Sequence, residues 1–423
     1  MKKKNRWSSW SRLFFWAHVV GVVGFYLTIW LRTRPDASDR LTRLDRKAPE
    51  PVGSEELPFI SIIVPARNEE RNIERCVTSL LEQDYPGYEV IVVDDGSTDR
   101  TSELLDQIQQ NHPQGGQLWI LRLRDELPVG WAGKPHALHS GVLEASGSWL
   151  LFTDADTYHT PSALRSALTQ AVTERMDLFT LATTQELPTF WERVLMPMAF
   201  MGISMLYPPR QVNDPASPTA IANGQFFLVR RAVYDAVGGY ARPELRQTLL
   251  DDRDLARVIK DHGYRLHFVD GQDAVSVRMY TSLEETWRGW RKNSYLGNRG
   301  GLLFVCAQLI GLPMITFSPF LLPFLGKGLE KVLGGHLTAK ERWFATGIEL
   351  TPLLAYRIWI NRQLAVPWYY ALTHPIAGLV FTGIMGQSTW NILTGKGVDW
   401  RGRRYHQIEA SNEPLHEKSQ PAV

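Results

Sequence analysis

Short runs of apolar, β-branched residues alternate with helical patterns along the middle of this chain of 423 residues. Four of these runs predict buried strands, at Phe59–Pro65, Glu89–Val93, Leu118–Leu123 and Trp149–Thr153. Between the strands, as from Ile73 to Leu81, apolar residues recur at the three- and four-residue spacing of helices. Strands that alternate with helices in this way form a largely parallel sheet covered on both faces. The sequence therefore predicts an α/β fold.

Polar and acidic residues directly follow three of the four predicted strands. The three clusters are Arg67-Asn68-Glu69, Asp94-Asp95-Gly96-Ser97 and Asp154-Ala155-Asp156. The carboxyl ends of parallel strands meet at one edge of the sheet, and open α/β sheets bind their ligands at that edge. Each cluster taken alone is equally well explained as a helix-capping turn. The three together predict one binding site.

Asp154 and Asp156 alternate along an extended chain end, a spacing at which two carboxylates can hold Mg²⁺ or Mn²⁺. Such a metal would neutralise the charge that builds up on a diphosphate leaving group. Upstream, the Gly130–His139 loop places glycines near Lys134, from which an ammonium group can reach a phosphate. The alternative for this loop is a turn with a solvated lysine. No Gly-x-Gly-x-x-Gly opens the first helix, which argues against a dinucleotide enzyme.

Asp251 and Asp252 stand at the start of a predicted helix whose buried face carries Val258 and Ile259. Acidic residues in a first helical turn are favoured by the helix dipole, so simple capping is one explanation. The functional explanation makes Asp252 a general base that removes a proton from an acceptor hydroxyl.

At these residues the sequence resembles the family-two glycosyltransferases, which have the Rossmann-like GT-A fold, over roughly Phe59 to Tyr295. The resemblance rests on Val64-Pro-Ala-Arg-Asn-Glu69, Val93-Asp-Asp-Gly-Ser-Thr-Asp99, Asp154-Ala-Asp156 and Asp251-Asp252. It implies an inverting, single-displacement transfer, with Asp95 contacting the nucleotide base, Asp156 as the more direct metal ligand and Asp252 as the catalytic base. The full set of expected donor-binding residues is Pro65, Asn68, Glu69, Asp94, Asp95, Lys134, Asp154, Trp287, Arg288, Trp290 and Arg291.

One departure from the family bears on the product. Processive polysaccharide synthases of this family carry Gln-x-x-Arg-Trp after the base, whereas this chain has Glu285-Thr-Trp-Arg-Gly-Trp-Arg291. The run keeps aromatic and cationic residues but not their spacing, which favours transfer of a single sugar; an amphipathic interfacial helix is the other explanation. The Gly130-Trp-x-Gly-Lys134 loop and the tail Val398–Tyr405 are closest to bacterial hopanoid-associated and carotenoid glycosyltransferases. That resemblance implies a lipid or isoprenoid acceptor.

Three apolar stretches are about long enough to span a bilayer: Leu13–Leu31, Leu302–Leu325 and Pro367–Trp390. Phe344–Ile360 contains two charged residues and predicts an interfacial or partly buried helix, and Val194–Tyr207 predicts an amphipathic surface or re-entrant segment. The expected organisation is an N-terminal transmembrane helix and linker (1–57), a GT-A domain (58–295), a C-terminal membrane region (296–395) and a basic tail (396–423). Both flanks of the first span are basic, so the positive-inside rule leaves the orientation open.

The function expected from the sequence is that of a multi-pass membrane glycosyltransferase that uses a divalent metal and moves one hexose from a nucleotide-sugar, with UDP-glucose as the default donor. The catalytic domain faces the cytoplasm if the donor is made there. The alternatives are a processive polysaccharide synthase and a non-catalytic membrane scaffold that retains the fold. A formal net charge of only +2 gives no reason to expect nucleic acid as a partner. Cys76 and Cys306 are not placed for a disulfide or a metal.

Overall fold

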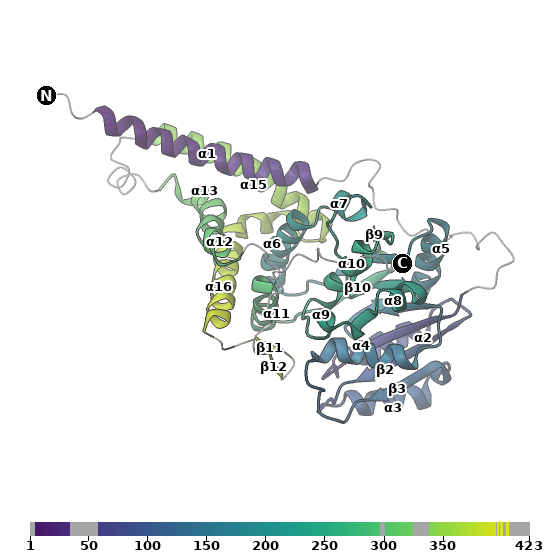
Figure 1. The fold of residues 1–423 in the computed structure, drawn as a ribbon. Helices are drawn as coiled ribbons and strands as arrows, with labels where there is room; N and C mark the ends of the chain where they lie inside the picture. The colour runs from purple at the N-terminus through teal and green to yellow at the C-terminus, as the bar shows by residue number, and fades with distance from the viewer. Residues whose placement is uncertain are drawn as a thin grey trace, which may run out of the picture.

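The computed structural model describes residues 5–33, 58–296, 301–324, 338–394, 396, 398–400 and 403–405. Figure 1 shows a sheet domain beside a layer of helices, with the long helix α1 (Asn5–Thr33) on the outer side of that layer.

The central sheet has seven strands in the order β3-β2-β1-β4-β8-β6-β9. The bounds of these strands are β1 (Ile60–Ala66), β2 (Tyr88–Asp94), β3 (Leu118–Arg122), β4 (Trp149–Phe152), β6 (Leu178–Ala182), β8 (Phe227–Arg230) and β9 (Leu266–Asp270). The four strands predicted from the sequence are confirmed to within one residue at each end. Neighbouring strands are parallel except where β8 pairs with β4 and β6. Strand β8 therefore begins at the edge where β1, β2 and β4 end.

Both faces of the sheet are covered by helices, as the apolar strands predict. One face packs against α2 (Ile73–Leu81), α3 (Thr101–Asn111) and α5 (Ala163–Thr173). The other face packs against α4 (Gly133–Glu144), α8 (Arg231–Ala236) and α10 (Asp251–Asp261). Strand β1 shows the alternation directly, because Ile62 joins the first core and Ile63 joins the second.

Short elements complete the sheet domain. A second sheet pairs β5 (Thr157–His159), β10 (Val275–Val277) and β7 (Thr184–Gln185), and the remaining turns are α7 (Pro209–Asn213), α9 (Pro243–Arg246), η1 (Gly115–Gln117) and η2 (Gly239–Ala241). Both cysteines have free thiols. Burial raises the pKa of the Cys76 thiol to about 12, so Cys76 behaves as a small core residue.

The helical layer has its own hydrophobic core. Its elements are α1, α6 (Phe190–Leu206), α11 (Leu283–Leu296), α12 (Gly301–Thr316), α13 (Ser318–Leu321), α15 (Ala339–Gln363), η3 (Trp368–Thr373) and α16 (His374–Leu393), followed by the strand pair β11 (Val398–Trp400) and β12 (Arg403–Tyr405). Tyr26 of α1, Leu195 of α6, Tyr356 of α15 and Phe381 of α16 are buried together in this core. Helices α6 and α11 belong to the middle of the sequence but pack in this layer, so they join it to the sheet domain.

Within the described ranges, only the helix at Arg12–Thr33 is long and apolar enough to cross a membrane. The expected span Leu302–Leu325 consists of two helices, α12 and α13, with a break at Phe317 just before Pro319, where proline cannot continue a helix. The expected span Pro367–Trp390 starts as the 3₁₀ turn η3 and then becomes α16. The multi-pass arrangement is therefore not confirmed.

The two remaining apolar predictions had different outcomes. Residues Phe344–Ile360 lie in α15, a partly buried helix in which both Glu349 and Arg357 are buried, as predicted. Residues Val194–Tyr207, expected as an amphipathic surface or re-entrant segment, lie in α6, and the surface alternative is wrong for the first half of the segment. Val194 and Leu195 are fully buried because α6 packs against α1, α15 and α16.

Candidate active site

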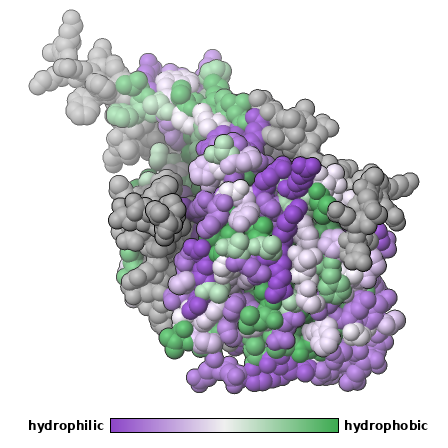
Figure 2. Space-filling model, turned by 45° about the vertical axis from the view of Figure 1, so that its right-hand side comes forward, coloured by the Kyte–Doolittle hydropathy of each residue, from purple (hydrophilic) through white to green (hydrophobic). Residues whose placement is uncertain are grey.

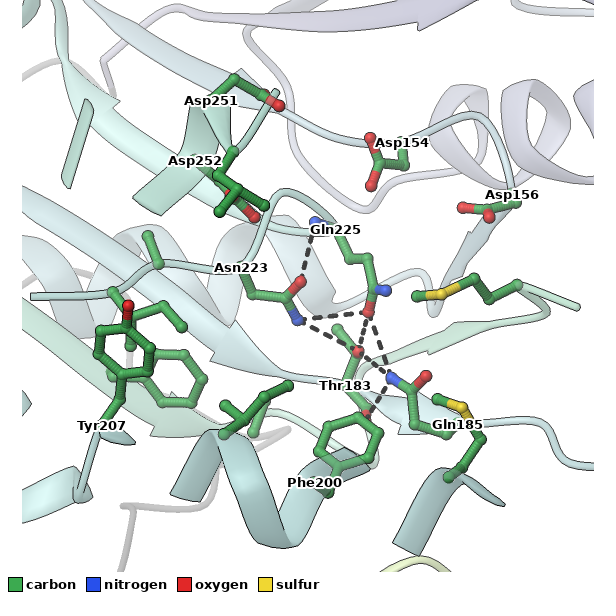
Figure 3. Close-up of a pocket in the computed structure, with 18 of the residues that line it drawn as sticks. Asp154, Asp156, Thr183, Gln185, Phe200, Tyr207, Asn223, Gln225, Asp251 and Asp252 are labelled. Atoms are coloured by element: carbon green, nitrogen blue, oxygen red, sulfur yellow. Dashed lines mark hydrogen bonds between the residues drawn. The ribbon is translucent and has the colours of Figure 1, made fainter. Parts of the chain in front are cut away.

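A cavity of about 1180 Å³ lies at the carboxyl edge of the central sheet, where it meets the helical layer. Asp95, Asp154 and Asp156 line it from the ends of β2 and β4, and Asp251 and Asp252 line it from the start of α10. Figure 3 shows the four carboxylates from β4 and α10 on one side of the pocket, with Phe200 and Tyr207 on the opposite side. The clusters predicted to meet at one sheet edge do meet.

The end of β1 supplies two kinds of residue. Pro65 and Glu69 line the cavity, as predicted for donor-binding residues. Asn68 lies outside the lining. Its backbone is left-handed, with φ of 55°, and its side-chain oxygen accepts a hydrogen bond from the backbone N–H of Thr98 at 2.8 Å. Asn68 therefore ties the loop after β1 to the loop after β2.

Of the adjacent residues Asp94 and Asp95, only Asp95 lines the cavity. Asp94 is fully buried and accepts hydrogen bonds from the backbone N–H of Ser97, at 2.9 Å, and from the Ser102 hydroxyl. Asp95 lines the cavity, and its carboxylate lies 3.9 Å from the Arg67 guanidinium. The geometry thus gives Asp94 a role in holding the loop and leaves Asp95 in position to contact a ligand.

Lys134 lies at the centre of the acidic cluster, in the first turn of α4 rather than in a loop. Its ammonium is 2.7 Å from Asp154 Oδ1 and 3.2 Å from Asp251 Oδ2. The solvated-lysine alternative is therefore wrong. Burial lowers the pKa of Lys134, but the carboxylates of Asp154, Asp251 and Asp252 outweigh burial and hold that pKa above its ordinary value. Burial raises the pKa of Asp251 to about 6, against the lowering effect of Lys134.

Asp252 is held by two backbone donors. Its Oδ2 accepts a hydrogen bond from the N–H of Gly224 at 2.8 Å, and its Oδ1 accepts one from the N–H of Arg253 at 2.7 Å. Gly224 lacks a side chain where space is short, because an added Cβ would lie 3.2 Å from Asp252 Oδ2 and 3.1 Å from Lys134 Nζ. A glycine at this position lets the carboxylate and the ammonium approach the backbone.

Helix α11 carries the aromatic and cationic run, and only part of it reaches the cavity. Trp290 lines the cavity. Trp287, Arg288 and Arg291 are outside the lining. The Trp287 indole donates a hydrogen bond to Gln387 of α16, Arg288 pairs with Glu284 on its own helix, and the Arg291 carbonyl accepts from Ser388 at 2.6 Å. Trp287 and Arg291 therefore fix α11 to α16, and Arg288 stays on its own helix.

Lys292, the next residue along α11, lines the cavity and was not predicted from the sequence. Burial, followed by the nearby charge of Lys134, lowers its pKa to about 8. Its sequence signal is weak, since one lysine after an aromatic run is ordinary on an amphipathic helix.

A network of amides beneath the carboxylates was also not predicted. Gln225 Oε1 accepts hydrogen bonds from Asn223 Nδ2 and from Gln185 Nε2, each at 3.3 Å, and also from the Thr183 hydroxyl (Figure 3). Asn223 and Gln225 lie just before β8. Because β8 is antiparallel, its first residues lie at the carboxyl edge of its neighbours. The sequence signal that was missed is the polar run Asn223-Gly-Gln225 before an apolar strand.

The residues present fit a divalent cation. Asp154 and Asp156 both line the cavity and offer the hard oxygen ligands that Mg²⁺ and Mn²⁺ prefer. Among the residues that the structure describes, no group of three or more His, Cys, Asp or Glu side chains is arranged as a complete metal site. Mg²⁺ bound to substrate phosphates commonly uses only one or two protein carboxylates, so two are enough. Lys134 holds Asp154 Oδ1, so Asp154 Oδ2 and the Asp156 carboxylate would be the ligands of such an ion.

Fold and site together define a class. Residues 61–238 match the family model described as "Glycosyl transferase family 2". The chain is a glycosyltransferase with a GT-A fold, and residues 61–238 are the part that is similar to family 2.

Two known proteins show what the chain is similar to. The 4,4'-diaponeurosporenoate glycosyltransferase of Staphylococcus aureus (strain MRSA252) is 25% identical over 357 residues, which cover 82% of this chain and 88% of the relative. Among solved structures, the mannosyltransferase PcManGT from Pyrobaculum calidifontis, in complex with GDP-Man and Mn²⁺, has a TM-score of 0.51 at 20% identity. That match covers 88% of this chain and 99% of the mannosyltransferase, and it supports the fold alone.

Proposed function

We propose that this chain transfers one hexose from a nucleotide-sugar to a hydroxyl of an apolar lipid, with inversion at the anomeric carbon. The observation that carries the proposal is the cavity itself, which joins a cluster of carboxylates to an apolar wall. Carotenoids and other isoprenoids are the acceptors of first choice, because the staphylococcal relative is named for a carotenoid acid. A UDP-hexose, with glucose as the default, is the donor of first choice.

Donor binding is assigned to the sheet side of the cavity. Asp95, Pro65 and Glu69 line the part that we assign to the nucleoside, and Asp154 and Asp156 line the part that we assign to the diphosphate. A Mg²⁺ or Mn²⁺ ion held by these two aspartates would neutralise charge on the leaving diphosphate. Lys292 adds a positive charge from α11, near the carboxylates of Asp154, Asp251 and Asp252. Asn68 and Asp94 contribute to donor binding indirectly, because they fix the loops that follow β1 and β2.

The chemical step is assigned to Asp252. The acceptor oxygen forms a bond to the anomeric carbon on the side opposite the diphosphate, and the bond from that carbon to the diphosphate oxygen breaks. The acceptor proton moves to the Asp252 carboxylate, and the nucleoside diphosphate leaves with the bonding electrons. The hydrogen bonds from Gly224 and Arg253 fix the position of this carboxylate, and position contributes as much as basicity to general-base catalysis.

A carboxylate acceptor is a second candidate, favoured by the name of the staphylococcal relative, whose acceptor is an acid. Arg210 and Lys292 line the cavity and match such an anion in charge. A carboxylate is already ionised at neutral pH, so its transfer needs no general base. Replacement of Asp252 therefore separates the two candidates.

We also propose that the helical layer sits in or on the membrane with the sheet domain in the cytoplasm, where nucleotide-sugars are made. Figure 2 shows hydrophobic residues gathered on the upper part of the molecule, at the height of α1 and α15, above a mainly hydrophilic lower rim. Leu13, Phe14, Val20 and Trp30 of α1 are each about half exposed or more. Exposed apolar surface of this kind marks a lipid or protein contact.

The test is a donor screen on the detergent-solubilised full chain, reading nucleotide diphosphate release with Mg²⁺ or Mn²⁺. We expect release that depends on the metal and increases when total membrane lipid is added. Release from no donor, with lipid present and the protein folded, would contradict the proposal and favour a non-catalytic scaffold.

A further inference from the structure

The cavity has a second, apolar arm that the donor does not account for. The volume of the whole cavity, about 1180 Å³, exceeds the roughly 300–1,000 Å³ of pockets that hold one small molecule. The carboxylates occupy one end only. The other end is formed by α6, by the end of α15 and by the end of α1, which all belong to the helical layer.

The walls of this arm are two helix faces. On α6, Met196, Phe200 and Ile203 line the cavity at the four- and three-residue spacing that places side chains on one helix face. On α15, Trp359 and Ile360 line it from adjacent positions. Both helices pack against each other elsewhere. Phe200, Ile203 and Trp359 are half-buried where they border the cavity, whereas Met196 and Ile360 are buried in its wall. Figure 3 shows Phe200 and Tyr207 across the pocket from Asp154 and Asp252.

Two buried contacts hold the helices around the arm in place. The Arg357 guanidinium of α15 donates a hydrogen bond to the Val194 carbonyl of α6 at 2.7 Å. The hydroxyls of Thr33 on α1 and Tyr356 on α15 are 3.2 Å apart. Arg357 and Tyr356 have almost no exposed surface, so both contacts are protected from water. The arm is thus a preformed space, which lowers the ordering cost of binding a ligand there.

The arm also reaches the helix that meets the criterion for a membrane span. Arg32 and Thr33, the last residues of α1, line the cavity. A hydrocarbon chain leaving a bilayer beside α1 would therefore meet this end of the cavity first.

We propose that the arm between α6 and α15 binds the hydrocarbon chain of a linear isoprenoid acceptor, with the reactive oxygen directed toward Asp252. This rests on the proposed function and adds to it the site and the residues that select the acceptor. Phe200 and Ile203 set the length and width of chain that fits, because they border the cavity from the C-terminal half of α6. The arm binds the hydrocarbon chain of the acceptor, and Asp252 takes the proton from the oxygen at the other end of the same molecule.

Photo-crosslinking tests the binding site without requiring turnover. The probe is a C20 prenyl alcohol with a diazirine near the middle of its chain, added to the solubilised full chain and mapped by mass spectrometry. We expect crosslinks on peptides that contain α6 and the end of α15, and competition by unlabelled C20 prenyl alcohol. Crosslinks confined to the outer faces of α1 or α16 would overturn the assignment, whether or not the protein transfers sugar.

Matched variants test selectivity. Ile203→Trp fills the arm, and Leu206→Trp adds the same ring at an exposed position on the same helix outside the lining. We expect Ile203→Trp to lose about tenfold or more of the crosslinking and of the transfer to the C20 alcohol, since a misfit of even one methylene in a hydrophobic pocket costs roughly 10- to 200-fold. Metal-dependent diphosphate release without acceptor should be unchanged in Leu206→Trp, which lies outside the cavity lining. Equal behaviour of the two variants toward the C20 alcohol would overturn the proposal.

Ile203→Ala keeps the proposal testable if the tryptophan variant does not fold. Removing three carbons widens the arm, so transfer should shift toward broader acceptors, such as an alcohol with a terminal ring. Loss of all diphosphate release in the unmodified protein would instead count against the proposed function, while crosslinking would still decide whether the arm binds a chain.

Discussion

Asp156 stands at the turn between β4 and β5, where its carboxylate lines the cavity two residues after Asp154. We expect Asp156→Ala to abolish metal-dependent donor binding, because Lys134 already holds one oxygen of Asp154. Calorimetry with UDP-glucose, with Mn²⁺ and with EDTA, measures this effect. Asp125→Ala, in an exposed loop, is the control. Metal-dependent binding that survives in Asp156→Ala would remove the metal assignment.

Asp252 offers a test of the chemical step alone. We expect Asp252→Asn to leave donor affinity nearly unchanged, since the amide keeps the shape of the side chain and an acceptor oxygen for Gly224. Transfer to a hydroxyl acceptor should fall by on the order of a hundredfold or more, the usual scale for loss of a general base. Initial rates with a prenyl alcohol measure this loss. Weak donor binding combined with a normal transfer rate would refute the role.

Residue type and strand position brought the right carboxylates together, but the sequence could not assign their separate tasks. Asp94 and Asp95 are identical in type and adjacent. Strand geometry turns one inward to the loop and the other to the cavity, and that depends on where β2 ends. Lys134 was expected to reach a phosphate, and the structure places it against Asp154 and Asp251. Which of several opposite charges a lysine selects is decided by three-dimensional packing.

At the scale of elements, the sheet strands were the most predictable part. A run such as Ile60–Ala66 is largely apolar on both faces, which is the pattern of a strand covered on both faces of a sheet. Strand β8 was not predicted, because its four residues carry too little periodicity. Its reversed direction brings Asn223 and Gln225 into the site. Helix α6 was expected as a surface or re-entrant segment, since its apolar run gives no sign of the helices that cover it.

Strand β5 carries a buried histidine that makes stability depend on pH. Burial lowers the pKa of His159 to about 3, and its Nε2 lies 3.0 Å from the Thr153 hydroxyl. His159 is therefore protonated below about pH 6.5 in the unfolded chain, but it stays neutral down to about pH 3 in the folded protein. The contribution of His159 to the free energy of unfolding is fully present above pH 6.5 and is lost as the pH falls toward 3. At pH 5 the loss is about 2 kcal/mol.

Thermal unfolding of the solubilised protein between pH 7.5 and 5 measures this loss. We expect His159→Gln to have a smaller decrease in melting temperature over that range than the unmodified protein. His262→Gln, at an exposed site, is the control and should behave like the unmodified protein. A pH dependence that is the same in all three proteins would contradict the assignment.

At the scale of the whole molecule, the main prediction concerns the membrane. The helical layer carries exposed apolar side chains on several helices, including Trp343 of α15 and Trp390 of α16, and aromatic rings of this kind suit the lipid–water interface. We expect the full chain to sediment with membranes and to stay there after extraction with alkaline carbonate, until detergent is added. Appearance of the protein in the carbonate supernatant would contradict an embedded α1.

The cavity is also a property of the whole molecule, and it could not be predicted from the sequence. Its walls come from segments as distant as Thr33, Phe200, Asp252 and Ile360, and no local pattern connects them. The chain order indicated a hydrophobic region after the catalytic residues. It did not indicate that α6, from the middle of the chain, would form the boundary between the two parts.

The central claim is that one hexose is joined to an apolar acceptor at this cavity. The most direct measurement is mass spectrometry of the products formed by the full chain from a radiolabelled donor and total membrane lipid, beside the Asp252→Asn variant. We predict a single labelled lipid, heavier than its acceptor by one hexose residue and greatly reduced with Asp252→Asn. A ladder of products with many sugars, or label recovered only as free sugar, would contradict the account.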